Sequence, residues 1–148
     1  MDWHSSHPDL RTAFKRESCF TLDYSRDRML HALGQLNEDD LWWRPYEEAN
    51  AAGNIVLHVC GNLRQWIIAG CGSVEDTRDR AAEFAQRQPI PADALADRLN
   101  RTVDEARQVI ARLDEGELLR TRFVQFVTVT GIGAITPSTE CSDDDWQK

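Results

Sequence analysis

The sequence predicts an all-α protein of a single domain, for three reasons. Apolar residues recur at steps of three and four in segments near residues 10–36, 54–70 and 92–113. Polar, glycine-containing or proline-containing stretches separate these segments, as expected between helices. The length of 148 residues, with 41% apolar and 28% charged residues, is typical of one globular domain. We therefore expect one domain over residues 1–148.

The first helix is predicted over residues 10–36, where one face collects the apolar side chains Phe14, Leu22, Met29, Leu30, Leu33 and Leu36. A polar break at residues 37–40 follows and supplies capping side chains. Pro45 then prevents a helix from continuing after the two tryptophans Trp42 and Trp43. This stretch is expected to be a short aromatic connection.

The second helix is predicted over residues 54–70, with Asn54 as its N-cap and the glycines Gly70 and Gly72 at its end. The third is predicted over residues 92–113, where apolar residues step by four, four, three, four and three at Leu95, Leu99, Val103, Ala106, Ile110 and Leu113. Residues 73–88 between them are mostly polar and charged, which predicts an exposed connection with a helical turn near residues 80–84.

The last part of the sequence has weaker patterns. Residues 123–129 are rich in β-branched and aromatic side chains, which favours an extended segment or short strand. A fourth helix can start at Thr130 and Gly131, but Pro137 interrupts it. Residues 138–148 have almost no apolar side chains, and we expect a disordered acidic tail there.

Charge and cysteine usage exclude several classes of function. The net charge of −8 and the lack of a Lys/Arg run argue against nucleic-acid binding. The four cysteines form no Cys-x-x-Cys pair, so a secreted disulfide scaffold is not expected. No apolar run approaches the roughly 20 residues of a membrane span. These observations predict a cytoplasmic protein that binds neither nucleic acid nor membrane.

Three passages resemble the DinB-like superfamily, which includes YfiT-type thiol transferases and mycothiol-dependent isomerases. The first passage, residues 36–45, contains Trp42, Arg44 and Pro45; the second and most specific, residues 54–67, contains His58; the third covers residues 76–84. Their order agrees with the superfamily over about residues 10–135. The resemblance implies an up-down four-helix bundle, here with a shortened or irregular fourth helix.

The resemblance also implies a divalent metal, zinc or nickel, held by one histidine of helix two and two histidines of helix four. His58 matches the first ligand. Counting forward without a gap places Cys141 and Asp145 at the other two positions, and both residue types can bind zinc. The resemblance and the apolar periodicity both end after residue 135, which indicates a frame change or divergence. An incomplete site without metal is therefore the expectation for this chain.

The singled-out residues also have plainer interpretations. Taken without the resemblance, His58 is a half-buried histidine satisfied by a carbonyl or carboxylate. Arg44 is expected to pair with a carboxylate across the bundle. His4 and His7 are interpreted as a pair at the chain terminus, and Cys60 and Cys71 as small packed thiols. The tryptophans Trp42, Trp43 and Trp66 are expected to supply buried aromatic area. Residues 143–145 are interpreted as part of a solvated acidic tail.

The sequence is compatible with two functions, one enzymatic and one not, and it does not decide between them. The first is a degenerate, non-catalytic bundle that acts as a dimerisation module. The second is an active metal-dependent S-transferase that uses a small-molecule thiol, as the resemblance implies. A short fourth helix predicts an apolar groove lined by Leu33, Leu63, Leu99 and Ile110, and such a groove favours a homodimer.

Overall fold

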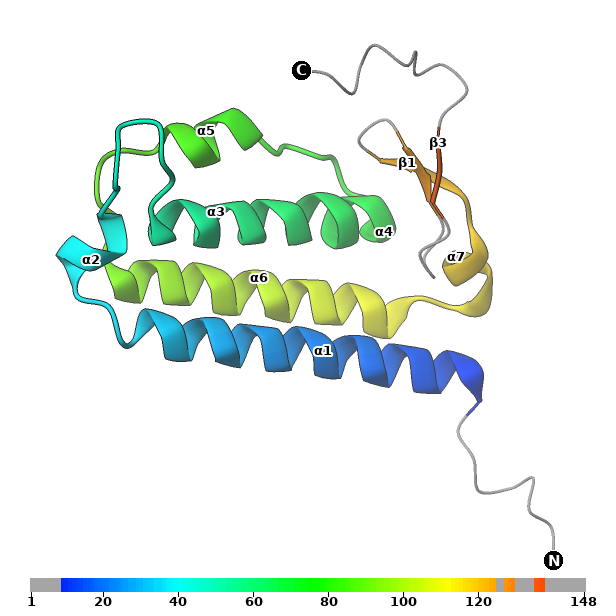
Figure 1. The fold of residues 1–148 in the computed structure, drawn as a ribbon. Helices are drawn as coiled ribbons and strands as arrows, with labels where there is room; N and C mark the ends of the chain where they lie inside the picture. Colours follow the sequence, from blue (N-terminus) through cyan, green and yellow to red (C-terminus); the bar gives the residue numbers. More distant parts are fainter. Residues whose placement is uncertain (1–8, 125–126, 130–134, 138–148) are drawn as a thin grey trace, which may run out of the picture.

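Three long helices lie side by side in the computed structural model, which describes residues 9–124, 127–129 and 135–137 (Figure 1). They are α1 (Leu10–Leu33), α3 (Ala52–Leu63) and α6 (Ala92–Arg112). A π-helical segment η2 (Arg64–Ala69) and the turn α4 (Gly70–Gly72) continue α3. The helical periodicities thus gave the right element types, and the all-α core is confirmed.

Helix α6 is the centre of the core, because both α1 and α3 pack against it. The apolar stripe predicted for this helix is buried along its whole length. Helix α1 runs antiparallel to α6, as shown by ion pairs of Asp23 with Arg107 (3.3 Å) and of Arg26 with Asp104 (3.6 Å). These pairs lie beside the apolar contact and fix the register of the two helices.

Helices α3 and α6 run in the same direction, so the expected up-down arrangement of all the long helices is wrong for this pair. Cys60 lies beside Thr102, and one turn later Arg64 bonds to Glu105 at 3.2 Å. The residue numbers therefore rise together along the contact. The physical reason is that residues 73–91 run back over the length of α3 before α6 begins (Figure 1).

The ends of the helices differ from the predicted ends by a few residues. Helix α1 ends at Leu33, before Gly34. Helix α3 begins at Ala52, so Asn54 is its third residue and not its N-cap as predicted. The Asn54 side chain accepts a hydrogen bond from the backbone N–H of the N-cap residue, Ala51, at 3.0 Å. The second helical stretch passes Gly70 and ends at Ser73, which adopts a left-handed conformation with φ of 59°.

Two short helices connect the long ones. Helix α2 (Glu38–Trp42) places the Trp42 ring against Gly53, so closely that a Cβ on Gly53 would lie 2.6 Å from the ring. The Trp42 indole N–H donates a hydrogen bond to the Ile90 carbonyl at 3.0 Å. Helix α5 (Arg80–Ala85) confirms the predicted helical turn and packs on α3 (Figure 1). The prediction of a wholly exposed connection is wrong, because Arg78 and Glu83 are buried in an ion pair.

The chain after α6 forms helix α7 (Glu115–Leu119) and three short antiparallel strands, β1 (Arg122–Val124), β2 (Val127–Val129) and β3 (Ile135–Pro137), in the order β1-β2-β3. Strands β1 and β2 confirm the extended prediction for the described part of residues 123–129. Ile135 lies in a strand rather than in the expected fourth helix. Thr130, Gly131 and the expected acidic tail at residues 138–148 lie outside the described residues.

The predicted apolar groove does not exist in the form expected, because Leu33, Leu99 and Ile110 are buried in the packed core. Apolar surface is exposed elsewhere, on α1, where Phe20 and Tyr24 are 63% and 59% exposed. Their rings stack with centroids 6.3 Å apart. Within the described part of the chain, no helix combines the length and apolar character needed to cross a membrane.

Candidate functional site

His58 lies on α3 and faces α5, rather than the core between α3, α6 and α1. Its side chain is 28% exposed. The ring nitrogen Nδ1 is 3.1 Å from Glu83 Oε2 and 3.0 Å from Arg78 Nη2. The ring also packs against Phe84, with the ring centroids 5.0 Å apart. The structure thus surrounds the candidate ligand with one carboxylate, one guanidinium and one aromatic ring.

Arg78 and Glu83 form a buried, two-pronged ion pair next to this histidine. Arg78 Nε donates to Glu83 Oε1 at 2.8 Å and Nη2 donates to Oε2 at 3.0 Å. The two side chains are only 3% and 8% exposed. Arg78 Nη1 also donates to Gln65 Oε1 at 2.8 Å, and Gln65 in turn donates to Asp76 at 2.7 Å. Both oxygens of Glu83 and every terminal nitrogen of Arg78 are therefore engaged.

The charge state of Glu83 follows from these contacts. Burial raises the pKa of its carboxyl, but the hydrogen bonds and charges of Arg78 and His58 lower it more, so the pKa lies below its ordinary value. Glu83 is accordingly ionised near neutral pH. Gly61 provides the space for this carboxylate, because a Cβ at that position would overlap Glu83 Oε1.

The described residues do not fit a divalent metal beside His58. Nδ1 already contacts Arg78 and Glu83, and both carboxylate oxygens of Glu83 accept hydrogen bonds from Arg78. Only Nε2 remains as a donor, and a single donor cannot hold zinc. Across residues 9–124 and the three described strands, no group of three or more His, Cys, Asp or Glu side chains gathers. Cys141 and Asp145 lie outside the described residues, as do His4 and His7.

Arg44 and Asn54 form a second buried polar cluster on the same side of α3. Asn54 is fully buried and accepts from Arg44 Nη2 at 2.8 Å, while its amide donates to the carbonyls of Glu83 and Gln86 at 2.9 and 3.1 Å. Arg44 Nη2 also donates to the Gln86 carbonyl at 2.9 Å. The expected carboxylate partner of Arg44 is thus replaced by an amide and carbonyl oxygens. This cluster fastens the end of α5 to the start of α3.

The other candidate residues take structural positions. Trp42 is buried, as expected for a tryptophan that supplies apolar area, whereas Trp43 is exposed and Trp66 is half-buried. Cys60 is buried, and burial raises the pKa of its thiol, so it stays protonated near neutral pH. Cys71 is half-buried, and its thiol donates to the Trp66 carbonyl at 3.6 Å. The environment of Cys60 is therefore not that of an activated nucleophile.

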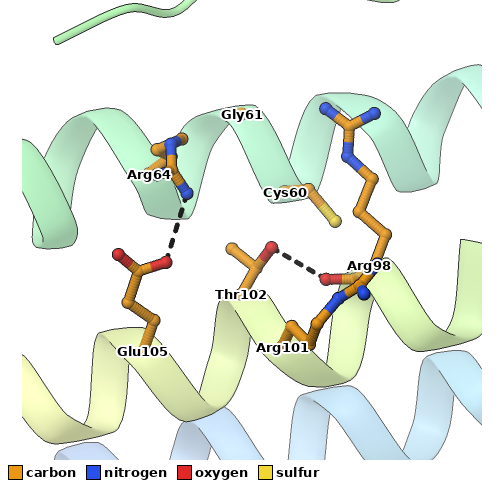
Figure 2. A pocket seen from close by; sticks show the side chains of 7 residues that line it. All are labelled: Cys60, Gly61, Arg64, Arg98, Arg101, Thr102 and Glu105. Carbon is orange, nitrogen blue, oxygen red and sulfur yellow. Dashed lines mark hydrogen bonds and ion pairs between the residues drawn. The ribbon is translucent and has the colours of Figure 1, made fainter.

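Sequence reasoning missed a groove between α3 and α6. The groove has a volume of about 350 Å³ and is lined by Cys60, Gly61, Arg64, Arg98, Arg101, Thr102 and Glu105 (Figure 2). The missed signal is the spacing of Arg98 and Arg101, which places both on one side of α6 next to the buried position of Thr102.

Comparison with known protein families finds a match over most of the chain. A family model described as mycothiol-S-transferase matches residues 20–131, which include most of α1, all of α3 and α6, and the site around His58. No curated protein matches the chain, and no solved structure does.

Proposed function

The chain belongs to the mycothiol-S-transferase family, within the DinB-like superfamily of metal-dependent proteins, and from this premise we propose that it is a member with an incomplete metal site that acts as a non-catalytic helical module. The observation that carries the proposal is the Arg78 guanidinium 3.0 Å from Nδ1 of His58. A permanent positive charge at this place opposes the binding of a second cation.

The charges around His58 support this proposal. Two like charges near each other in a partly buried site repel by several kcal/mol, at roughly 4 kcal/mol for unit charges about 4 Å apart at the effective dielectric constant of a protein surface. The repulsion from Arg78 would be larger for a divalent ion. The negative charge of Glu83, whose Oε2 lies 3.1 Å from Nδ1 of His58, offsets part of this repulsion, but Arg78 engages both carboxylate oxygens and so occupies the carboxylate that a metal would need as a ligand. In this arrangement Arg78 supplies the positive charge that neutralises Glu83.

The module is proposed to form a homodimer in the cytoplasm. Exposed stacked aromatic rings such as Phe20 and Tyr24 favour association, because burying them removes apolar surface from water. The net charge of −8 supports a role without nucleic acid. Light scattering should give a dimer for the wild type and a monomer for the Phe20→Ser/Tyr24→Ser variant. The control Tyr46→Ser, which changes an exposed aromatic residue elsewhere, should stay dimeric.

The alternative is an active metal-dependent S-transferase, and the family match supports it. Such an enzyme lowers the pKa of a small thiol so that the thiolate is available near neutral pH. It needs a zinc or nickel ion and ligands beyond His58. The candidates for those ligands are Cys141 and Asp145, which the described structure does not include.

Metal analysis separates the two functions. Protein purified without a histidine tag is incubated with zinc or nickel, desalted, and assayed for metal content and for thiol transfer from mycothiol to an electrophile. We expect substoichiometric metal and no rate above the blank. One metal ion per chain that is lost in His58→Ala, together with thiol transfer, would establish the enzyme instead. Cys141→Ser and Asp145→Asn would then identify the remaining ligands.

A further inference from the structure

The groove between α3 and α6 is built by facing residues of two helices that run in parallel. The α3 side contributes Cys60, Gly61 and the first residue of η2, Arg64; the α6 side contributes Arg98, Arg101, Thr102 and Glu105. Figure 2 shows the Arg98 side chain extending from α6 toward α3, and Arg64 reaching from the start of η2 to Glu105. The volume of about 350 Å³ is within the range of small-molecule sites.

The charges in this groove do not balance. Three guanidinium groups face one carboxylate, that of Glu105, which pairs with Arg64 at 3.2 Å. Arg98 and Arg101 have no carboxylate partner among the residues that the structure describes. They lie three residues apart on one helix, where like charges repel each other. The groove thus carries two uncompensated positive charges in a protein with a net charge of −8.

The floor of the groove supplies no negative charge. Burial raises the pKa of the Cys60 thiol despite the nearby charge of Arg98, so the thiol is neutral near pH 7. The Thr102 hydroxyl donates its hydrogen bond to the Arg98 carbonyl at 2.8 Å. The two free guanidinium groups therefore depend on solvent or on a bound anion for their partners.

Two features of the backbone shape this groove for a ligand. Arg64 is the first residue of the π-helical segment η2, and such segments in helices are frequent at functional sites. Gly61 contributes only backbone to the wall of the groove, because Glu83 and Arg78 occupy the side of Gly61 to which a Cβ would point. A second cavity of about 360 Å³ shares Gly61, Arg64 and Arg98 with the groove and extends to the Arg78–Glu83 pair. The two cavities thus share the wall formed by Gly61, Arg64 and Arg98.

We propose that this groove binds a small organic or inorganic dianion through Arg98 and Arg101, with Arg64 at its edge. The guanidinium fork matches carboxylate and phosphate oxygens in paired hydrogen bonds, so the ligand carries either two carboxylates or one phosphate group. The size of the groove fits a small molecule, and the net charge of −8 disfavours a nucleic acid. The proposal does not depend on whether His58 binds a metal.

Calorimetric titration of the full chain tests the proposal with two probes, succinate for the dicarboxylate class and inorganic phosphate for the phosphate class. Ionic strength is held constant with chloride. The test variant is Arg98→Gln/Arg101→Gln. The control is Arg28→Gln/Arg112→Gln, which removes the same two positive charges from exposed helical positions that do not line the groove.

We expect one probe to bind saturably with one site per chain, and the test variant to weaken that binding by at least tenfold, since hydrogen bonds between a guanidinium and an anion are among the strong ones. The control variant should bind as the wild type does, and circular dichroism should show both variants folded. Which probe binds identifies the ligand class. Absence of saturable binding by both probes overturns the proposal, as does equal weakening in the test and control variants.

Discussion

Replacing Glu83 with glutamine tests the buried ion pair beside His58 directly. Glu83→Gln keeps the shape of the side chain but removes its charge, which leaves the Arg78 guanidinium in a site where it is only 3% exposed. Breaking one partner of a buried pair costs roughly 3–5 kcal/mol, because the other charge stays buried without compensation. Glutamine keeps one carbonyl acceptor for Arg78. We therefore expect a loss of about 3 kcal/mol in the free energy of unfolding.

Urea denaturation at pH 7 measures this loss, and Glu17→Gln provides the matched control. Glu17 pairs with Arg16 at 2.9 Å, but the two side chains are 62% and 69% exposed. Such a pair contributes less than about 1 kcal/mol. If Glu83→Gln and Glu17→Gln lower the free energy of unfolding equally, then the reasoning from burial is wrong.

The same pair predicts how stability depends on pH. The pKa of Glu83 is lower in the folded chain than its ordinary value of 4.5, so ionised Glu83 stabilises the fold. This contribution is complete above the ordinary pKa and is lost as the pH falls through the lower folded pKa. The difference in unfolding free energy between the wild type and Glu83→Gln should therefore shrink below about pH 4.5. A difference that grows on acidification would contradict the assigned charge state.

Two further substitutions address the neighbouring contacts. Gly61→Ala should lower the free energy of unfolding by about 1–3 kcal/mol, because the added Cβ displaces the Glu83 carboxylate. A double-mutant cycle measured by thermal melting should show a smaller loss for Gly61→Ala when Glu83→Ala is also present. Asn54→Ala should cost about 3 kcal/mol, because it removes one acceptor of Arg44 and the side-chain partners of the Ala51 N–H and the Glu83 carbonyl. Asn62→Ala on the same helix should change the midpoint of urea denaturation little.

The helices were predictable because their patterns are local. The apolar stripe from Leu95 to Leu113 places a helix over residues 92–113, and the structure has Ala92–Arg112. The relative direction of α3 and α6 was not predictable in the same way. It depends on where residues 73–91 pack, and their charged sequence has no apolar face that would indicate a return along α3.

The site was only partly predictable for a related reason. His58 stood out because its surrounding residues resemble a family motif, but its partners Arg78 and Glu83 are charged residues in a polar segment, which normally indicates exposure. Two such residues can be buried when they neutralise each other and share hydrogen bonds. The burial of this pair depends on packing against α3, and the periodicity of one segment carries no information about such a tertiary contact.

Helix α5 gives the residues of the family motif a structural role that requires no metal. It has six residues, which is too short for a helix to be stable by itself. Arg44 and Asn54 bind the carbonyls at its C-terminal end, and Arg78 joins the segment before it to Glu83 and to His58 on α3. Together these polar contacts hold α5, and the residues on either side of it, against α3 and the connection that precedes α3. The tryptophan-arginine-proline connection, the buried asparagine and the histidine therefore have a structural role in holding α5 on the bundle, and this role is independent of whether His58 ever completes a metal site.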